Sequence, residues 1–253
     1  MKQKQKIFKY IRFIILIASI AVFIYGAYNL IRIFLDYRAI DNLTSEMQER
    51  YTSVVQSNHV ETIPEHLIID WDALLNRNRD VVAWIYLPGT NINHVVLQGE
   101  TNDTYLRHTI DREFSPAGSL FIESGNDPLF RDLNTIIHGH NMRNNSMFSA
   151  INHLAEGRIP VPSHVQLYLP DGRLKLYRIV SISQTNVVSA LFSGNPLTIE
   201  DFFTLMDQGR TFSAEFDREN VEHLLTLSTC GNFVTATPSR TVLYSVLERV
   251  YNI

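Results

Sequence analysis

Cys230 is the only cysteine of the chain and ends an apolar run, His223-Leu-Leu-Thr-Leu-Ser-Thr-Cys230. Arg240 follows ten residues later, and the cluster His138-Gly139-His140-Asn141 stands about ninety residues earlier. A thiol can attack a carbonyl carbon, an imidazole can move protons, and a guanidinium can stabilise an oxyanion. Together these three side chains are sufficient for acyl transfer through a thioester, provided that the fold brings them together.

Each of these residues also has a structural interpretation when it is taken alone. A cysteine at the end of an apolar strand is usually a small buried side chain. An arginine in a strand is usually solvated or ion-paired. Strand alternation puts Thr226, Ser228 and Cys230 on one face. Gly231 is expected to end the strand and begin a loop, which favours exposure of Cys230 at the end of the strand.

The chain has nine histidines, so a histidine somewhere near the cysteine proves little. His138 and His140 differ from the others because they end a predicted strand, Thr135-Ile-Ile137, and share a face if that strand continues. Such a pair can also bind a metal ion. No recognisable spacing supplies a third ligand, and a lone cysteine cannot supply a multi-thiolate set. Metal binding stays an alternative, and alternation does not choose between the two histidines.

The first 35 residues indicate a membrane anchor. Five basic residues precede an uncharged run, Phe13 to Ile31: Lys2, Lys4, Lys6, Lys9 and Arg12. In a helix this run is roughly 28 Å long, close to the thickness of a bilayer core. A cleaved signal peptide has a shorter apolar core and a small-residue exit, which Gly26-Ala27-Tyr28-Asn29 does not supply. We therefore expect an uncleaved anchor with a cytoplasmic N-terminus and the remaining chain outside.

The residues after this segment are acidic. All 26 acidic residues and 16 of the 22 basic residues lie at Asp36 or beyond, which gives the exported part a formal charge of −10. Nucleic acid is therefore not an expected partner. One cysteine cannot form an intramolecular disulfide, so a lone thiol outside the membrane calls for another explanation.

Helices and then strands follow the anchor. Apolar residues recur every three or four positions from Ile40 to Val54, which predicts an amphipathic helix, more consistent with packing on its own domain than with a coiled coil. A short helix is predicted at 70–76, and a further helix at 197–206 with Thr198 as its cap. About eight strands are predicted, at 81–87, 94–97, 119–122, 135–137, 165–169, 174–180 and on either side of Cys230. This pattern predicts a mostly β fold, a closed or nearly closed antiparallel barrel.

Several of these motifs together resemble those of the sortases, the membrane-anchored cysteine transpeptidases of Gram-positive bacteria. They are Thr226-Leu-Ser-Thr-Cys230, Arg240, Gly139-His140-Asn141-Met142 and Ser146-Met147-Phe148. Asp80-Val-Val-Ala-Trp-Ile-Tyr-Leu-Pro-Gly-Thr-Asn-Ile92 and the helix before the cysteine strand resemble class B in particular. The resemblance covers about 70–253 and implies an eight-stranded sortase-type β-barrel, with N-terminal helices and a helix inserted before the cysteine strand.

The resemblance also implies roles for individual residues. Cys230 would be the nucleophile, His140 the general acid and base, and Arg240 the stabiliser of the oxyanion and the substrate. Ser228 and Thr229 lie within the matching motif and would line the substrate groove. Many relatives carry an acidic residue soon after the cysteine, whereas this chain has Gly231-Asn232.

The expected organisation is a basic cytoplasmic tail at 1–12, a transmembrane signal-anchor at 13–33, an extracytoplasmic helical linker at 34–69 and a catalytic domain at 70–253. By resemblance, the enzyme cleaves the C-terminal sorting signal of a secreted protein after a threonine. It then transfers the acyl group to a primary amine of cell-wall precursor, with no cofactor and no metal. The alternatives are a pilin-polymerising sortase that uses a pilin lysine as acceptor, a thiol hydrolase, and a membrane-tethered domain with a metal at His138 and His140.

Overall fold

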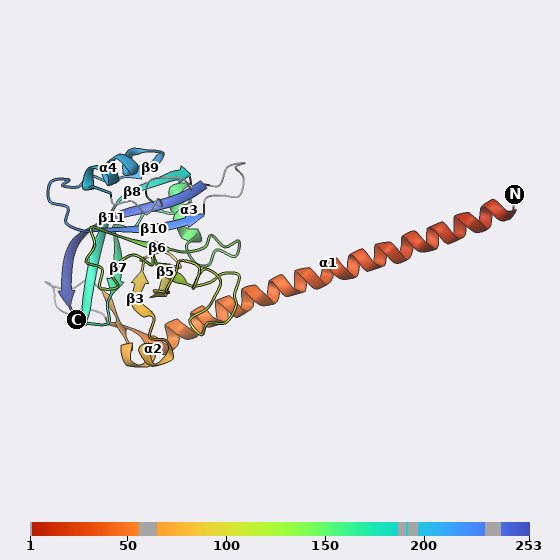
Figure 1. Ribbon diagram of the computed structural model, residues 1–253, viewed down its shortest axis with the longest axis horizontal. Coiled ribbons are helices and arrows are strands. Elements are labelled where there is room, and N and C mark those ends of the chain that lie inside the picture. Colours follow the sequence, from red (N-terminus) through yellow and green to blue (C-terminus); the bar gives the residue numbers. More distant parts are fainter. Residues whose placement is uncertain (1, 56–64, 187–190, 192–196, 231–238) are drawn as a thin grey trace. The chain divides into compact units, whose positions relative to one another are not determined.

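The computed structural model describes residues 2–55, 65–186, 191, 197–230 and 239–253 (Figure 1). The chain divides into two compact units, Met1–Asn42 and Leu43–Ile253.

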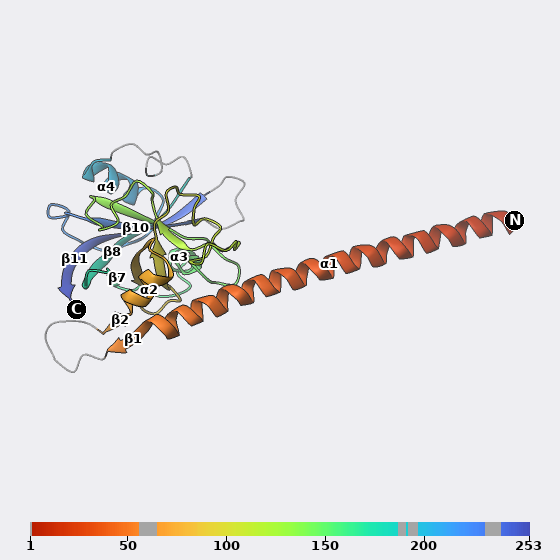
Figure 2. The same cartoon turned by 60° about the horizontal axis from the view of Figure 1, so that its bottom comes forward.

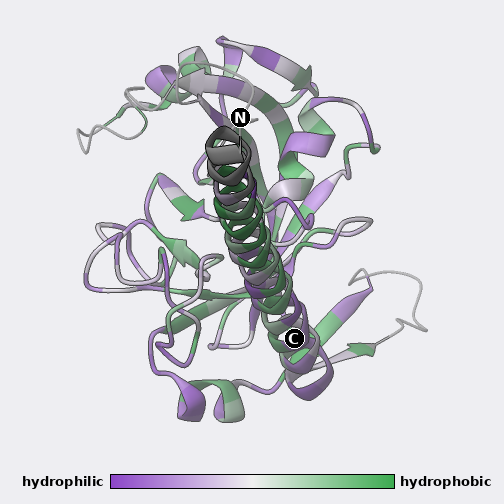
Figure 3. Ribbon diagram, turned by 90° about the vertical axis from the view of Figure 1, so that its right-hand side faces the viewer, coloured by the Kyte–Doolittle hydropathy of each residue, from purple (hydrophilic) through white to green (hydrophobic). Residues whose placement is uncertain are grey.

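The first unit is helical. Helix α1 spans Lys2–Tyr51, and only its last turns, from Leu43, belong to the second unit. The stretch from Tyr10 onward is long and apolar enough, by length and composition, to cross a membrane. Figure 3 shows hydrophobic residues along much of this helix and hydrophilic residues toward its end. A single-pass anchor is compatible with this helix.

The segment after α1 differs from the expected helical linker. The helix ends at Tyr51, and β1 (Thr52–Val55) pairs antiparallel with β2 (His66–Ile69) (Figure 2). Both strands contain β-branched residues, which favour extended backbone and offset the helical periodicity that precedes them. The predicted short helix is present as α2 (Trp71–Arg77), and the side chain of Asp70 caps it by accepting a hydrogen bond from the backbone N–H of Ala73. The compact second unit thus begins before residue 70.

A closed barrel forms the body of the second unit. Its eight strands pair in the order β11-β10-β6-β5-β4-β3-β7-β8, and β8 pairs with β11 to close the ring, while β9 (Arg210–Ser213) adds to the free edge of β8. The eight strands are β3 (Val81–Tyr86), β4 (Asn93–Leu97), β5 (Leu120–Ile122), β6 (Asn134–His138), β7 (His164–Tyr168), β8 (Arg173–Asn186), β10 (Leu224–Cys230) and β11 (Ser239–Asn252). The predicted eight-stranded barrel is confirmed, but the expectation that it is antiparallel throughout is wrong, because β4 pairs parallel with β5 and β6 pairs parallel with β10.

Two helices complete the barrel. Helix α3 (Ser149–Ala155) follows β6, and α4 (Ile199–Asp207) lies between β8 and β9, as Figure 1 shows. The side chain of Thr198 accepts from the N–H of Asp201, and the Asp201 carboxylate accepts from the N–H of Thr198, which completes a capping box. The helix expected before the cysteine strand is therefore confirmed, together with its cap.

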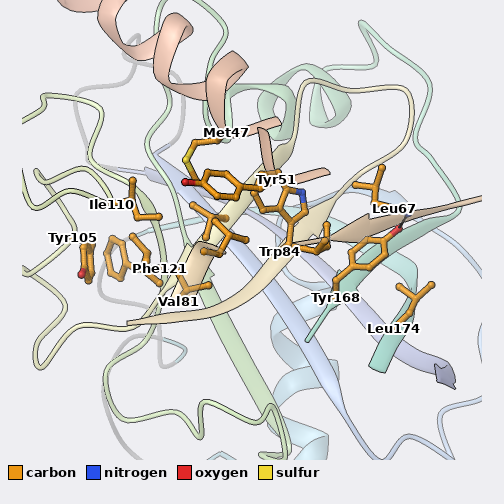
Figure 4. Close-up of a cluster of buried hydrophobic side chains, with 14 residues drawn as sticks. Met47, Tyr51, Leu67, Val81, Trp84, Tyr105, Ile110, Phe121, Tyr168 and Leu174 are labelled. Atoms are coloured by element: carbon orange, nitrogen blue, oxygen red, sulfur yellow. Dashed lines mark hydrogen bonds between the residues drawn. The ribbon is translucent and has the colours of Figure 1, made fainter. Parts of the chain in front are cut away.

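Two clusters of buried hydrophobic side chains hold the unit together. One lies against α4 and includes Phe202, Met206, Val242 and Tyr244. The other joins the last turns of α1 to α2, β3, β5 and β7, and includes Met47, Tyr51, Trp84, Phe121 and Tyr168 (Figure 4). The end of α1 therefore packs on its own domain, as the amphipathic pattern predicted.

His94 is a buried titratable residue of β4. Its side chain is buried, with 9% exposed, and Nε2 has no hydrogen-bond partner in the described part of the chain. Burial lowers the pKa of His94 to about 4 from its ordinary 6.5, because the charged ring loses its hydration. Below pH 6.5 the unfolded chain binds a proton that the folded chain does not yet bind.

We expect the free energy of unfolding to fall as pH drops from about 6.5 to about 4, by up to about 3 kcal/mol in total from this group. His94→Gln should flatten that part of the stability curve, measured by urea unfolding of the full chain in detergent between pH 4 and 8. His153→Gln on α3 is the control for loss of an imidazole elsewhere in the fold. An identical slope in the His94 variant and the parent chain would contradict the prediction.

Candidate active site

Strand pairing brings the three predicted catalytic positions to one end of the barrel. Strand β10 pairs antiparallel with β11, with Cys230 opposite Arg240. On its other side β10 pairs parallel with β6, with Ser228 opposite His138, and the N–H of Gly139 donates to the Ser228 carbonyl at 3.1 Å. This pairing ends at Ser228 and His138, each two residues before Cys230 and His140 respectively, so both segments leave the barrel at the same end. The side chain of Cys230 and residues Gly231 and Asn232 lie outside the described part.

His140 is held on two sides by the backbone of its surroundings. Its Nε2 lies 2.7 Å from the carbonyl oxygen of Leu106, and its own carbonyl accepts from the N–H of Phe148 at 3.0 Å. A carbonyl oxygen can only accept, so Nε2 must carry the proton of this hydrogen bond. In the neutral ring, Nδ1 is then the nitrogen that remains able to accept a proton.

The glycine between the two histidines is a packing requirement. A Cβ built at Gly139 would lie 2.4 Å from Cδ2 of Leu120 and 2.6 Å from Cδ2 of Phe148. Either contact would require the side chain of Leu120 or Phe148 to shift. The small residue thus allows the chain at the end of β6 to pack closely against both side chains.

His138 has a different environment from His140. Its Nε2 is 2.8 Å from Oε2 of Glu123, and its ring lies against that of Phe121 with 5.2 Å between centroids. The hydrogen bond from His138 lowers the pKa of Glu123, against the opposing effect of burial and with a further lowering contribution from Asn102. The structure therefore separates two histidines that alternation left equivalent: one is paired with a carboxylate and one with a backbone carbonyl.

Arg240 lies between two strands. Its backbone pairs with Cys230 of β10 on one side and with Thr185 of β8 on the other, and its side chain is half-buried. A guanidinium remains charged throughout the physiological pH range and offers several donors in one plane. At this position it can bind an oxyanion that forms beside the cysteine strand.

Ser228 and Thr229 are fully buried, and their hydroxyl oxygens have no hydrogen-bond partner in the described residues. Their expected contribution to a substrate groove stays a prediction. In the same part of the chain, no group of three or more histidine, cysteine, aspartate or glutamate side chains is gathered closely enough to hold a metal ion.

Sequence reasoning missed two participants in this site. Leu106 contributes a backbone carbonyl, which no residue type signals. Glu123 directly follows β5, and an acidic residue at the end of a predicted strand was a signal that could have been used. Together with the strand register, the Leu106 carbonyl gives an imidazole of defined orientation and a guanidinium residue opposite a lone cysteine position, groups of the kinds that acyl transfer uses.

The comparisons with known proteins agree with this arrangement. The family model described as "Sortase domain" matches residues 85–248. The chain is 25% identical to Sortase B of Staphylococcus aureus over 241 residues, covering 94% of this chain and 96% of that protein. It is also similar to Sortase B of Listeria monocytogenes, with 28% identity over 156 residues, covering 60% of this chain and 63% of that protein.

A solved structure of Clostridium perfringens sortase B has a TM-score of 0.62 and 32% identity, and the alignment covers 70% of this chain and 99% of that one. A class B sortase of Streptococcus pyogenes that is involved in pilus biogenesis shares the fold, with a TM-score of 0.61 and 24% identity over 71% of this chain and 98% of that one. The chain therefore belongs to the sortase family, the cysteine transpeptidases, and to its class B.

Proposed function

We propose that this sortase cleaves the C-terminal sorting signal of secreted proteins and transfers the acyl group to a primary amine of cell-wall precursor. The thiolate of Cys230 attacks the scissile carbonyl carbon, and the negative charge that develops on its oxygen is stabilised by Arg240. His140 gives a proton to the departing amine as the peptide C–N bond breaks, which leaves a thioester on Cys230. The incoming amine then attacks this thioester and loses a proton to His140, and the C–S bond breaks to release the Cys230 thiolate.

The observation that carries this proposal is the shared register of β6, β10 and β11. Cys230 is directly opposite Arg240, and Gly139 is bonded to the strand that ends in Cys230. These pairings are backbone interactions, so they do not depend on side-chain rotamers. The hydrogen bond from Nε2 of His140 to Leu106 supports Nδ1 as the proton-transfer atom.

A thioester on Cys230 is the first expected outcome. The full chain in detergent is incubated with peptides from candidate sorting signals, with and without an amine, and its intact mass is followed. We expect an acyl adduct that is absent in Cys230→Ala and is discharged faster when amine is added. Discharge at the same rate with and without amine would instead indicate a thiol hydrolase. Full peptide cleavage by Cys230→Ala would rule out the mechanism.

The same assay compares two acceptors. One arm supplies an amine-bearing peptidoglycan precursor and the other a pilin-derived lysine peptide. The pilin arm is included because the Streptococcus pyogenes relative is involved in pilus biogenesis. Faster discharge by the precursor supports cell-wall anchoring, and faster discharge by the lysine peptide supports pilin polymerisation.

The two histidines provide a matched test of the proposed acid–base role. His140→Gln should lower kcat/KM by about 10²- to 10⁴-fold, because the proton donor and acceptor are lost. His138→Gln removes the partner of Glu123 instead. It should lower the melting temperature and should reduce kcat much less than His140→Gln does. Peptide cleavage and thermal unfolding are measured on both variants. A larger loss of kcat in His138→Gln than in His140→Gln would reverse the assignment.

We also propose that the chain is a single-pass membrane protein with a cytoplasmic N-terminus and an extracytoplasmic catalytic domain. The basic residues before the apolar run and the apolar helix itself support this orientation. Because Cys230 is the only cysteine, a membrane-impermeant maleimide reports its side of the membrane directly.

Labelling of intact protoplasts should equal labelling of permeabilised ones. The purified folded protein serves as the control for reactivity of the thiol. Labelling that requires permeabilisation would place the domain in the cytoplasm.

A further inference from the structure

The carbonyl that holds His140 belongs to a long connection between β4 and β5. These two strands are parallel, with Val96 opposite Leu120, so the chain must return along the barrel between them. We call this connection, residues 98–119, the return loop. Leu106 lies in its middle, and its carbonyl accepts from Nε2 of His140 at 2.7 Å. The direction of the imidazole therefore depends on how firmly the return loop is held.

Polar groups at the turn between α2 and β3 hold one part of this loop. Nδ2 of Asn78 donates to the hydroxyl of Tyr105 at 2.8 Å and to the carbonyl of Ile110 at 2.6 Å. The Tyr105 hydroxyl in turn donates to Asp80 at 2.5 Å. Tyr105 is fully buried and immediately precedes Leu106, so this network limits movement of the carbonyl.

Gly118 packs against the same carbonyl from the other arm of the loop. Its backbone has φ +57°, and a Cβ at this position would lie 2.4 Å from the Leu106 oxygen. The N–H of Ser119 also donates to the Tyr105 carbonyl at 3.0 Å. The carbonyl of Leu106 is thus set by contacts from both arms of the loop.

Arg77, at the end of α2, links the return loop to the last turns of α1. Its Nε and Nη2 donate to the two carboxylate oxygens of Asp111 at 2.8 and 2.7 Å, and its Nη1 donates to Glu46 at 2.9 Å. Met47 and Tyr51 lie within 3.3 and 3.4 Å of the same nitrogen. The Arg77 side chain is only 17% exposed, so its two ion pairs are partly shielded from water.

The hydrophobic layer beneath these ion pairs joins the same segments. Figure 4 shows Met47 and Tyr51 of α1, Tyr105 and Ile110 of the return loop, and Phe121 of β5 in one cluster. The apolar contacts bring α1 and the loop together without specifying a register, because dispersion and burial are not directional. The two hydrogen bonds from Arg77 to Asp111 are directional, so they specify how the loop lies relative to α2.

We propose that Arg77 is a positioning residue, which anchors the return loop through Asp111 and thereby holds the Leu106 carbonyl where it orients His140. This inference rests on the proposed acid–base role of His140. Loss of the guanidinium would leave the carboxylates of Glu46 and Asp111 without their shared cation and would release the arm of the loop at 107–114. Displacement of a proton-transfer group by even a fraction of an ångström lowers the rate of the chemical step more than it lowers substrate binding.

The test compares Arg77→Gln with Arg173→Gln in the full chain in detergent. Arg173 is the matched control, because its Nε donates to Asp171 at 2.8 Å in another arginine–aspartate pair, at the turn between β7 and β8. We expect Arg77→Gln to lower kcat for peptide cleavage by roughly tenfold, with KM changed less than about twofold. Arg173→Gln should retain the kcat of the parent enzyme.

Two further measurements separate positioning from a general loss of stability. The imidazole Nε2–H resonance of His140, protected in the parent chain by its hydrogen bond, should broaden in Arg77→Gln. Hydrogen–deuterium exchange of peptides covering 101–118 should rise in the same variant. Neither should change in Arg173→Gln, even if both variants lose similar melting temperature. If Arg77→Gln does not fold, Asp111→Asn breaks the loop side of the pair with little change in shape and should give the same pattern.

An unchanged kcat together with an unchanged His140 resonance in the folded variant would overturn the proposal. That outcome is distinct from failure of the proposed function, which would appear as activity that persists in Cys230→Ala or His140→Gln. A loss of activity in Arg77→Gln with a sharp, unshifted His140 resonance would also overturn it, because the loss would then not pass through the imidazole.

Discussion

The parallel pairing of β6 with β10 is the interaction on which the site depends. Most neighbouring strands of this barrel are antiparallel, and antiparallel neighbours send consecutive strand ends to opposite rims. Because β6 and β10 run in the same direction, His140 and Cys230 leave the barrel at the same rim although about ninety residues separate them. The antiparallel partner β11 begins at that rim, which is why Arg240 is opposite Cys230. One parallel pair flanked by one antiparallel pair is sufficient to gather the three positions.

The surroundings of His140 use backbone groups where other enzymes use a carboxylate. A carbonyl acceptor fixes which nitrogen carries the proton, as a carboxylate would, but it stabilises the imidazolium less because it has no formal charge. The nearby carboxylate of Glu123 is directed to His138 instead. The Leu106 carbonyl thus orients the imidazole of His140, whereas the negative charge of Glu123 lies beside the other histidine. The return loop has to be rigid as a consequence, since a carbonyl can orient a ring only as precisely as its own chain is held.

The polar clusters around the return loop and the hydrophobic cluster beneath it serve different purposes. Burial of Tyr51, Trp84 and Phe121 supplies free energy, to a first approximation in proportion to the apolar area removed from water. The hydrogen bonds of Asn78 and Arg77 contribute less net free energy each, but they are directional and specify one arrangement of the loop. The last turns of α1 take part in both, and they belong to the same compact unit as the barrel.

The sequence by itself determined most of the elements and the family. The alternating runs predicted the strands, Thr198 predicted the start of α4, and the motifs around Cys230, His140 and Arg240 predicted the family. These features are local, because periodicity, capping and motif spacing are properties of neighbouring residues.

Only the tertiary structure decided which groups surround the histidines. Glu123 and His138 meet through the pairing of β5 with β6, and the Leu106 carbonyl reaches His140 across 34 residues of chain. The change from helix to hairpin after Tyr51 was also unpredictable from periodicity, because β1 is stabilised by a partner strand that begins at His66. Contacts of this kind depend on packing between distant segments. Residue type does not indicate which backbone carbonyl will accept a particular hydrogen bond, because every residue has one.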